Sequence, residues 1–483
     1  MNRFVDPLIW ILAVCTAAGP LALTAHGQIT WHVPSDAPTI EAAISAASEG
    51  DTIVVGPGDW SPPAQLEPYN FLGKNLRLVS SHGPAQTSLV SVSGWATFPV
   101  VRFENGEGPS ALLEGFTIRG GVTSAYANTA GVKISNASPT VRGNVFDGVK
   151  ALRGGGLWIG PNSSARIEDN RFVNCYASDQ GGALFIQDAS PLLRRNVICN
   201  NRAFNGGGGI SIWGSTTGSP TNAVPRIEAC TLFGNSTTPV HSGGRGGAIH
   251  IGMWNGTVGT QIVHALIRDC IVWGNTSANA PGIAFHSSGS LTIEYTDTQE
   301  SWGGPGMLVA NPLFRAAAAG DFGLLSGSPC VDAGSPASPL DPDGSRADMG
   351  AVWFCAPPAV YGTGKLASHG LTPSVGWNGE PSVSAASFEV TVQQAVPQRA
   401  GLFFWGATPA STPFVGGYKL VASPTLRLPI LQTDAAGSAS QVITIDASML
   451  GARRCYQFWF RDPQHTDGTA AGLSDGLEVT FCP

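Results

Sequence analysis

The chain has 483 residues, enough for two or three domains, with 62 glycines, 35 prolines and only 12% charged residues. This composition favours short strands and tight turns over helices. The balance of 26 basic against 33 acidic residues, without a long run of Lys or Arg, gives no electrostatic reason to bind nucleic acid or anionic lipid, so we expect neither partner.

The first 27 residues are typical of an export signal. A basic start precedes an apolar stretch from Pro7 to Ala25, and Ala25-His26-Gly27 has the small-x-small form of a cleavage site. Cleavage after Gly27 predicts a secreted or cell-surface protein with no membrane span once the signal is removed. An uncleaved membrane anchor is the alternative, because the stretch is close to the ~20 residues needed to span a bilayer.

Residues 37–60 predict a cap at the start of the fold. Ile40, Ala43, Ile44 and Ala47 have helical spacing, the pattern stops at Gly50, and residues 52–55 predict a strand. We expect this short amphipathic helix to cover an open first coil.

A glycine-rich stretch recurs after the cap, as RGGGLWIG (153–160), QGGALFIQ (180–187), GGGGISIW (206–213) and RGGAIHIG (245–252). Glycine allows a sharp corner with positive φ before each strand. A phosphate-binding loop would instead precede a helix. When the stretches are aligned, two apolar columns flank a mixed one, which holds Lys133, Trp158, Phe185, Ser211, His250 and Ala284. Side chains alternate in a strand, so we expect the apolar columns inside and the mixed column outside.

A second segment repeats in the same register. Its apolar column holds Leu113, Val141, Ile167, Leu193, Ile227, Ile267 and Ile293, at steps of 28, 26, 26, 34, 40 and 26 residues. A period of 26 residues with two short strands and no helix predicts a β-solenoid with loops inserted in the two longest steps.

The next column alternates in charge, through Glu114, Arg142, Glu168, Arg194, Glu228, Arg268 and Glu294. Coils stack about 4.8 Å apart, so alternation predicts attraction between neighbouring coils. A polar column follows, with Asn144, Asn170, Asn196, Cys230 and Cys270. Stacked asparagine amides can bond from coil to coil, so we interpret both columns as structural.

The helix, GDTIVVGPG (50–58), GKNLRLVSS (73–81) and the glycine-rich coils resemble secreted right-handed parallel β-helix proteins of the pectin-lyase-like superfamily. The resemblance covers roughly residues 30–355. Residues 311–351 resemble an ending that many bacterial members share. The resemblance as a whole implies an all-β, right-handed parallel β-helix over residues 28–355, after a signal peptide at 1–27.

Residues 356–483 alternate in the manner of a small antiparallel β-sandwich, joined by a linker near 355–364. Eight cysteines remain after signal removal, an even number suited to an oxidising compartment. We predict that Cys455 pairs with Cys482. Cys230 and Cys270 form either a bridge or two stacked thiols, and Cys175 with Cys199 and Cys330 with Cys355 are further candidate pairs.

Relatives of this fold often bind or cleave acidic polysaccharides, by Ca²⁺-assisted β-elimination or by hydrolysis with paired carboxylates. The polygalacturonase-type motifs are missing, and carboxylates of the repeat are scattered over different columns. Asp341, Asp343 and Asp348 offer oxygen ligands for Ca²⁺ within eight residues, and a solvated turn is the alternative.

The outward column predicts a binding row for a polysaccharide. Trp158, Phe185, Ser211, Trp213 and His250 are the expected binding residues, since pyranose faces pack on aromatic rings. Inserted loops that fold over the row are the alternative. Lys133 is the candidate base if the chain is a lyase acting on a uronate polymer. The missing motifs favour a non-catalytic binding protein, which we expect to be a monomer.

Overall fold

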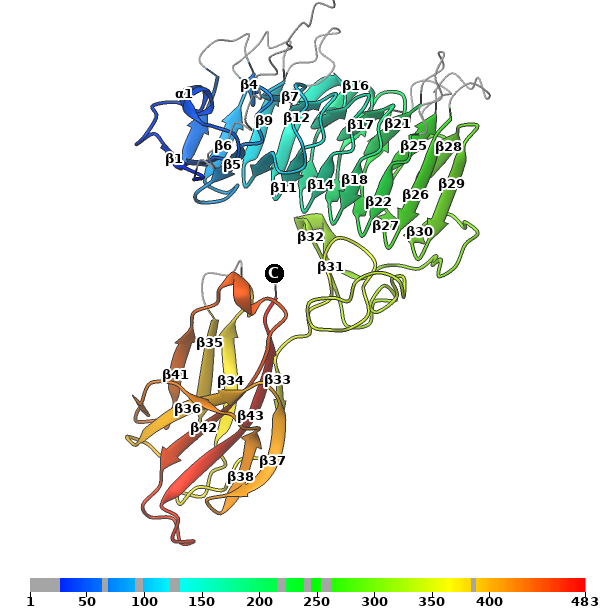
Figure 1. Cartoon of the computed structure of the whole chain (residues 1–483). Helices are drawn as coiled ribbons and strands as arrows, with labels where there is room; N and C mark the ends of the chain where they lie inside the picture. Colours follow the sequence, from blue (N-terminus) through cyan, green and yellow to red (C-terminus); the bar gives the residue numbers. More distant parts are fainter. Residues whose placement is uncertain are drawn as a thin grey trace, which may run out of the picture.

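The computed structural model describes residues 27–62, 68–91, 99–121, 131–214, 223–238, 245–252, 262–383 and 388–482, so the expected signal peptide lies outside the described residues apart from Gly27. Short parallel strands wind into a solenoid, and a second, antiparallel unit follows at the C-terminal end (Figure 1). No helix of the described part is long and apolar enough to cross a membrane.

Each coil contributes strands to parallel sheets that we name A, B and C. Sheet A, in stacking order, consists of β1 (Thr30–Val33), β2 (Thr52–Val55), β5 (Arg77–Ser80), β8 (Leu112–Glu114), β11 (Thr140–Arg142), β14 (Arg166–Glu168), β18 (Leu192–Arg194), β22 (Arg226–Glu228), β26 (His264–Arg268) and β29 (Ser290–Glu294). Sheet C consists of β4 (Tyr69–Asn70), β7 (Val101–Phe103), β10 (Val132–Ile134), β13 (Leu157–Ile159), β17 (Leu184–Gln187), β21 (Ile210–Trp213), β25 (Ile249–Gly252) and β28 (Ile283–His286).

Sheet B lies between them along each coil and is the part of the repeat that the two-strand prediction missed. It consists of β3 (Gly58–Trp60), β6 (Thr87–Val90), β9 (Thr117–Gly121), β12 (Val145–Arg153), β15 (Arg171–Val173), β16 (Tyr176–Gln180), β19 (Val197–Cys199), β20 (Arg202–Ala203), β23 (Thr231–Phe233), β24 (Ser236–Thr237), β27 (Ile271–Trp273) and β30 (Asp297–Thr298). In the coils that carry Asn144, Asn170 and Asn196, the asparagine turn ends a three-residue strand of sheet A, and the strand of sheet B begins at the next residue.

The predicted cap and core are confirmed. Helix α1 (Ile40–Ala46) begins at Thr39, whose side chain accepts from the Ala42 amide, and it buries Ile40, Ala43 and Ile44 against the first coils. The apolar columns pair in register and are buried, apart from the half-buried Phe285 in the last coil. Alternation along each strand therefore leaves the mixed column of sheet C on the outer face.

Buried amides bond from coil to coil at the predicted turn. Nδ2 of Asn144 donates to Oδ1 of Asn170 at 3.1 Å, and Asn170 donates to Asn196 at the same distance. A second ladder, which the sequence analysis missed, runs through Asn201, Asn235 and Asn275. Its asparagines are spaced by 34 and 40 residues, the same steps as in the first ladder. This spacing is the sequence signal that could have revealed the second ladder.

After the last coil, residues 311–355, which we call the strap, return along the solenoid. The strap contains β31 (Phe314–Ala316), a 3₁₀ turn (Ala317–Ala319) and β32 (Asp321–Leu324). It is held by the Asp269 carboxylate, which accepts from the Ser335 amide and the Ser338 hydroxyl, and by the Ala351 amide, which donates to Thr231 Oγ1. Phe322 packs against Phe233 of sheet B.

The C-terminal unit is antiparallel, as predicted. One of its sheets contains β33 (Ala359–Tyr361), β36 (Ala400–Gly406), β39 (Leu426–Arg427), β40 (Leu431–Gln432), β42 (Arg453–Arg461) and β43 (Ala471–Thr480). A second sheet contains β34 (Ser374–Gly379), β35 (Phe388–Gln393) and β41 (Ala439–Ile443), and β37 (Pro409–Phe414) and β38 (Gly417–Val421) form a hairpin. A short 3₁₀ turn spans Ala447–Met449.

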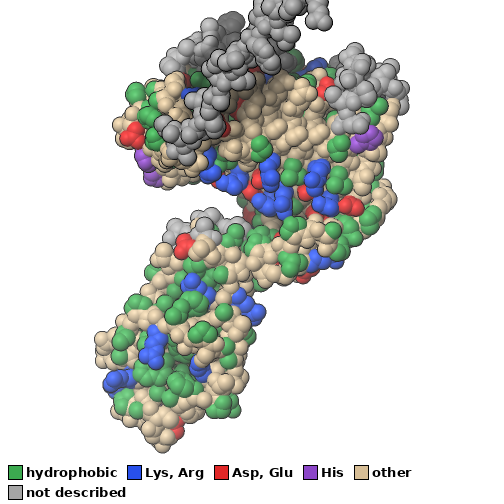
Figure 2. Space-filling model, in the orientation of Figure 1, with side chains coloured by type: hydrophobic (Ala, Val, Ile, Leu, Met, Phe, Trp, Pro, Cys, Tyr) green, Lys and Arg blue, Asp and Glu red, His purple; other side chains and the backbone are tan. Residues whose placement is uncertain are grey.

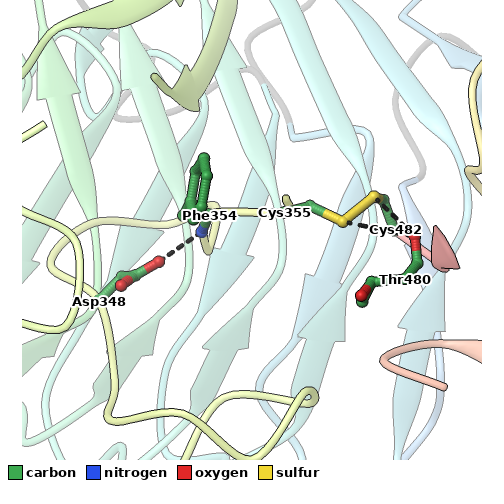
Figure 3. The surroundings of a disulfide bond; sticks show 5 residues. All are labelled: Asp348, Phe354, Cys355, Thr480 and Cys482. Atoms are coloured by element: carbon green, nitrogen blue, oxygen red, sulfur yellow. Dashed lines mark hydrogen bonds between the residues drawn. A yellow bond between two sulfur atoms is a disulfide. The ribbon is translucent and has the colours of Figure 1, made fainter. Parts of the chain in front are cut away.

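The predicted bridge between Cys455 and Cys482 is wrong. Cys482 is bonded to Cys355, with a Cα–Cα distance of 5.9 Å (Figure 3). Cys455 is a free thiol that packs between Phe404 and Val421, because it lies within β42 whereas Cys482 follows the end of β43. Cys175, Cys199, Cys230, Cys270 and Cys330 are also free and buried, so of the two alternatives for Cys230 and Cys270 the structure has stacked thiols.

Candidate functional site

The predicted row lies on the outer face of sheet C. Lys133 stands opposite Trp158, Trp158 opposite Phe185, Phe185 opposite Ser211, and Ser211 opposite His250, on successive coils. Trp213 lies two residues beyond Ser211 on β21. The structure therefore brings the six predicted residues onto one face, but their accessibility differs along it.

The accessible end of the row holds Lys133 and Trp158. Nζ of Lys133 lies 5.5 Å from the Trp158 ring centroid and 3.3 Å from Oε2 of Glu104, and its side chain is 33% exposed. Arg102, on the preceding coil, pairs with the same carboxylate at 3.2 Å. The indole lies against Gly160, where an added Cβ would come within 2.1 Å of the ring, so the missing side chain makes room for Trp158.

The side chain of Arg153 covers the middle of the row. The guanidinium of Arg153 stacks 4.5 Å from the Trp213 ring centroid and 5.5 Å from that of Phe185, and Asp179 holds it at 2.6 Å. The two rings meet edge to face at 5.1 Å. Phe185 is fully buried. The expectation of an exposed Phe185 is therefore wrong, and of this pair Trp213 alone is partly exposed.

The far end of the row is buried too. Ser211 is fully buried and donates to Oε1 of Gln180 at 2.9 Å. His250 is fully buried, and neither ring nitrogen has a hydrogen-bond partner in the described part of the chain. Burial, with smaller contributions from His286 and Arg245, lowers the pKa of His250 to about 3. Ser211 and His250 therefore do not form an open stacking surface, which corrects the prediction.

The three aspartates proposed for Ca²⁺ do not form a metal-binding group. Asp341 accepts from the Asp348 amide, Asp343 from Ser345, and Asp348 from the amides of Asp332 and Phe354. Oδ2 of Asp341, Oδ1 of Asp343 and both oxygens of Asp348 thus already accept hydrogen bonds that would compete with a cation. No group of three His, Cys, Asp or Glu side chains in the described ranges could hold a metal.

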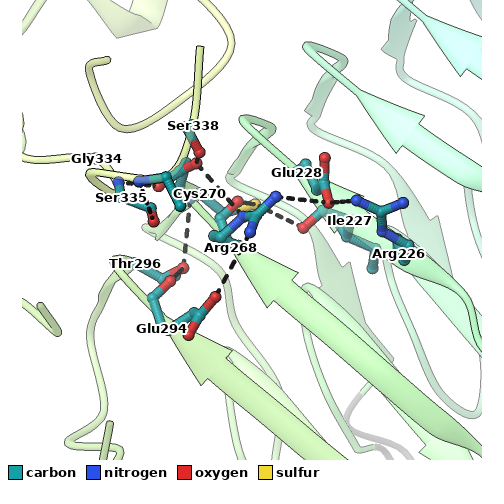
Figure 4. Close-up of polar contacts among 12 residues, drawn as sticks. Arg226, Ile227, Glu228, Arg268, Cys270, Glu294, Thr296, Gly334, Ser335 and Ser338 are labelled. Atoms are coloured by element: carbon teal, nitrogen blue, oxygen red, sulfur yellow. Dashed lines mark hydrogen bonds and ion pairs between the residues drawn. The ribbon is translucent and has the colours of Figure 1, made fainter. Parts of the chain in front are cut away.

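A charged cavity of about 690 Å³ lies between sheet A and the strap. Acidic and basic side chains gather on this flank of the solenoid (Figure 2). Glu228 pairs with Arg226 on its own strand and with Arg268 on the next coil, and Arg268 also reaches Glu294 at 3.8 Å (Figure 4). The two ion pairs of Arg268 link neighbouring coils.

The predicted charge ladder is only partly formed. Arg142 pairs with Glu114 at 2.8 Å, but Glu168 turns to Arg166 on its own strand instead of to the neighbouring coils. Among the described contacts, the Arg194 guanidinium therefore has no ion pair. Arg166 and Arg226 lie two residues before the glutamates on the same face of the strand, so they compete with the arginines of neighbouring coils for Glu168 and Glu228. The alternating column alone did not reveal this competition.

The family model that matches this chain agrees with the coil geometry. Residues 105–224 match the family model described as "Right handed beta helix region". Among solved structures, "Crystal structure of pectate lyase Pel9A" matches with 14% identity and a TM-score of 0.34, over 68% of this chain and 97% of that one. No curated protein sequence matches. The described coils form a right-handed parallel β-helix.

Proposed function

We propose that the protein is exported and binds a polysaccharide outside the cell, without cleaving it, at the Lys133–Trp158 end of sheet C. The observation that carries this proposal is the partly exposed indole of Trp158, seated on Gly160 and flanked by the Lys133 ammonium. An aromatic ring held by backbone packing on one strand of a rigid sheet is a pre-organised surface for the apolar face of a sugar.

The charges beside Trp158 favour a polymer that contains uronate units. Lys133 and Arg102 share the single carboxylate of Glu104, so two cations stand beside one anion. A sugar carboxylate next to a ring stacked on Trp158 would find a cation on the adjacent coil, about 4.8 Å away.

The alternative, a lyase with Lys133 as base, has less support. A general base must be free to accept a proton, and a desolvated apolar pocket favours that state. Lys133 instead has a carboxylate 3.3 Å away and a partly exposed side chain. The described residues also offer no group of three metal ligands that would neutralise a substrate carboxylate.

Affinity electrophoresis of the purified protein against neutral and acidic polysaccharides tests the proposal. We expect retardation in a gel containing a uronate polymer, and no increase in ultraviolet absorbance from unsaturated ends when the two are incubated. Migration that no polysaccharide changes would contradict binding, and a rise in absorbance that Lys133→Ala abolishes would establish the lyase alternative.

A further inference from the structure

Hydrogen-bond donors without acceptors collect at the buried end of sheet C. Oε1 of Gln180 accepts from Ser211 Oγ at 2.9 Å and from the Trp213 indole nitrogen at 2.8 Å. An indole N–H can only donate, so the atom that it meets must be the amide oxygen, and the orientation of the amide is fixed. The Gln180 Nε2 group is therefore a donor; it is fully buried and has no partner among the residues that the structure describes.

His250 faces the same corner from two coils further along. An added Cβ on Gly206, which pairs with Gln180, would lie 2.7 Å from His250 Nδ1. The ring of His286 is 5.6 Å from that of His250, and its Nδ1 is also buried without a partner. Burial and then Arg245 lower the pKa of His286, so both rings are neutral near pH 7 and each carries one N–H donor.

Arg245 adds a positive charge to this group. Its backbone pairs with Gly206, so Gln180, Gly206 and Arg245 stack on successive coils. Its side chain is half-buried and makes no ion pair among the described residues. A half-buried cation without an ion pair, beside buried donors, is unfavourable unless a ligand supplies the negative charge.

We propose that Gln180, Arg245, His250 and His286 form a binding site for an oxyanion, either a free inorganic anion or the carboxylate of a sugar. An oxyanion accepts several hydrogen bonds at once and can form a bidentate pair with a guanidinium group. A metal ion would fit less well, because Arg245 repels it and Gln180 Nε2 offers no lone pair. The site does not depend on polysaccharide binding at Trp158.

Isothermal titration calorimetry with sodium sulfate, sodium phosphate and sodium glucuronate, at constant ionic strength in chloride, tests this site. Gln180→Glu keeps the two accepted bonds and replaces the donor by a carboxylate oxygen, so we expect at least about tenfold weaker binding. Arg202→Gln, which removes an exposed cation on β20, is the matched control and should bind as the wild type does.

Binding of sulfate or phosphate alone would identify a free inorganic anion as the ligand, and binding of glucuronate alone would identify a sugar carboxylate. Histidine ring ¹⁵N shifts provide a second readout, because a bound anion should move the His250 signals in the wild type and not in Gln180→Glu. If that variant does not fold by circular dichroism, Arg245→Gln replaces it, with the same expected loss. No binding of any probe by the wild type, or equal binding by the folded variants, would overturn the proposal.

Discussion

The thiol sulfur of Cys230 lies 3.4 Å from the backbone nitrogen of Asn196, in the place that an asparagine oxygen occupies in the two preceding coils at 3.0 Å. Sulfur is a weak acceptor, so the ladder continues here with a weaker bond. Each thiol stands in for an amide, which explains why Cys230 and Cys270 are buried and stacked without being bridged.

Cys230→Asn should therefore raise the thermal midpoint. The new oxygen would accept from Asn196, and the new amide would reach the Leu193 carbonyl, 3.7 Å from the present sulfur. We expect a gain of about 1 kcal/mol, whereas Asn170→Ala, which leaves buried partners unsatisfied, should cost about 2 to 3 kcal/mol. Differential scanning calorimetry of both variants measures this; a lower midpoint for Cys230→Asn would show that the thiol is required for packing.

The bridge between Cys355 and Cys482 closes a long loop, since the two residues are 127 positions apart. Chain entropy gives such a bridge about 4 to 5 kcal/mol of stabilisation. Cys482→Ser should therefore lower the unfolding midpoint of the C-terminal unit, and Cys455→Ser should lower it less. Non-reducing peptide mapping of exported protein should recover the Cys355–Cys482 peptide; a Cys455–Cys482 peptide would contradict the structure.

Arg268 contributes more to coil stacking than Arg194 does. Arg268 bridges Glu228 and Glu294 on the two neighbouring coils and is 20% exposed, whereas Arg194 has no ion pair among the described contacts. Arg268→Ala should cost about 2 kcal/mol, because it removes the links to both neighbouring coils and leaves the partly buried Glu294 carboxylate without its ion pair. Arg194→Ala should cost under about 0.5 kcal/mol. Urea unfolding measures both, and equal costs would mean that the ion pairs do not stabilise the stack.

The strap should lose stability as the pH rises through the neutral range. Burial, and then repulsion from neighbouring carboxylates, raises the pKa of Asp341 to about 7 and that of Asp348 to about 6. The folded state thus binds protons that the unfolded state has already released, so stability falls between about pH 4 and pH 7.

Asp341→Asn keeps an acceptor for the Asp348 amide and removes the charge, so it should flatten this pH dependence and raise the midpoint at pH 8. Asp59→Asn, at an exposed position of β3 in the first coils, is the control and should leave the slope unchanged. Thermal melts from pH 4 to pH 8 provide the measurement; a wild-type midpoint that rises over this range would contradict the shifts.

The solenoid was predictable because its period repeats every structural requirement. Apolar alternation, corner glycines and the Asn144 column recur at fixed spacing. A pattern found in one coil could therefore be checked against the same positions of the other coils. Sheet B was missed because its strands follow the asparagine turn directly and have no glycine signal of their own.

The burial of the row was not predictable from strand alternation. Lys133 and Trp158 are accessible as expected, but Arg153 stacks on Phe185 from the end of β12, on a different sheet. Sequence spacing gives the face on which a residue lies, and contacts between sheets decide whether it is covered. The prediction of a Cys455–Cys482 bridge failed for the same reason. The aromatic residues beside these two cysteines gave no information on how the strap approaches Cys482.

Replacement of Trp158 tests the central claim most directly. In affinity electrophoresis with a uronate polysaccharide that retards the wild type, Trp158→Ala should abolish most of the retardation, because the ring on Gly160 is the proposed stacking surface. Trp377→Ala, which removes a 38% exposed indole from the C-terminal unit, should migrate as the wild type does. Full retardation of a folded Trp158→Ala protein would contradict binding at this end of sheet C.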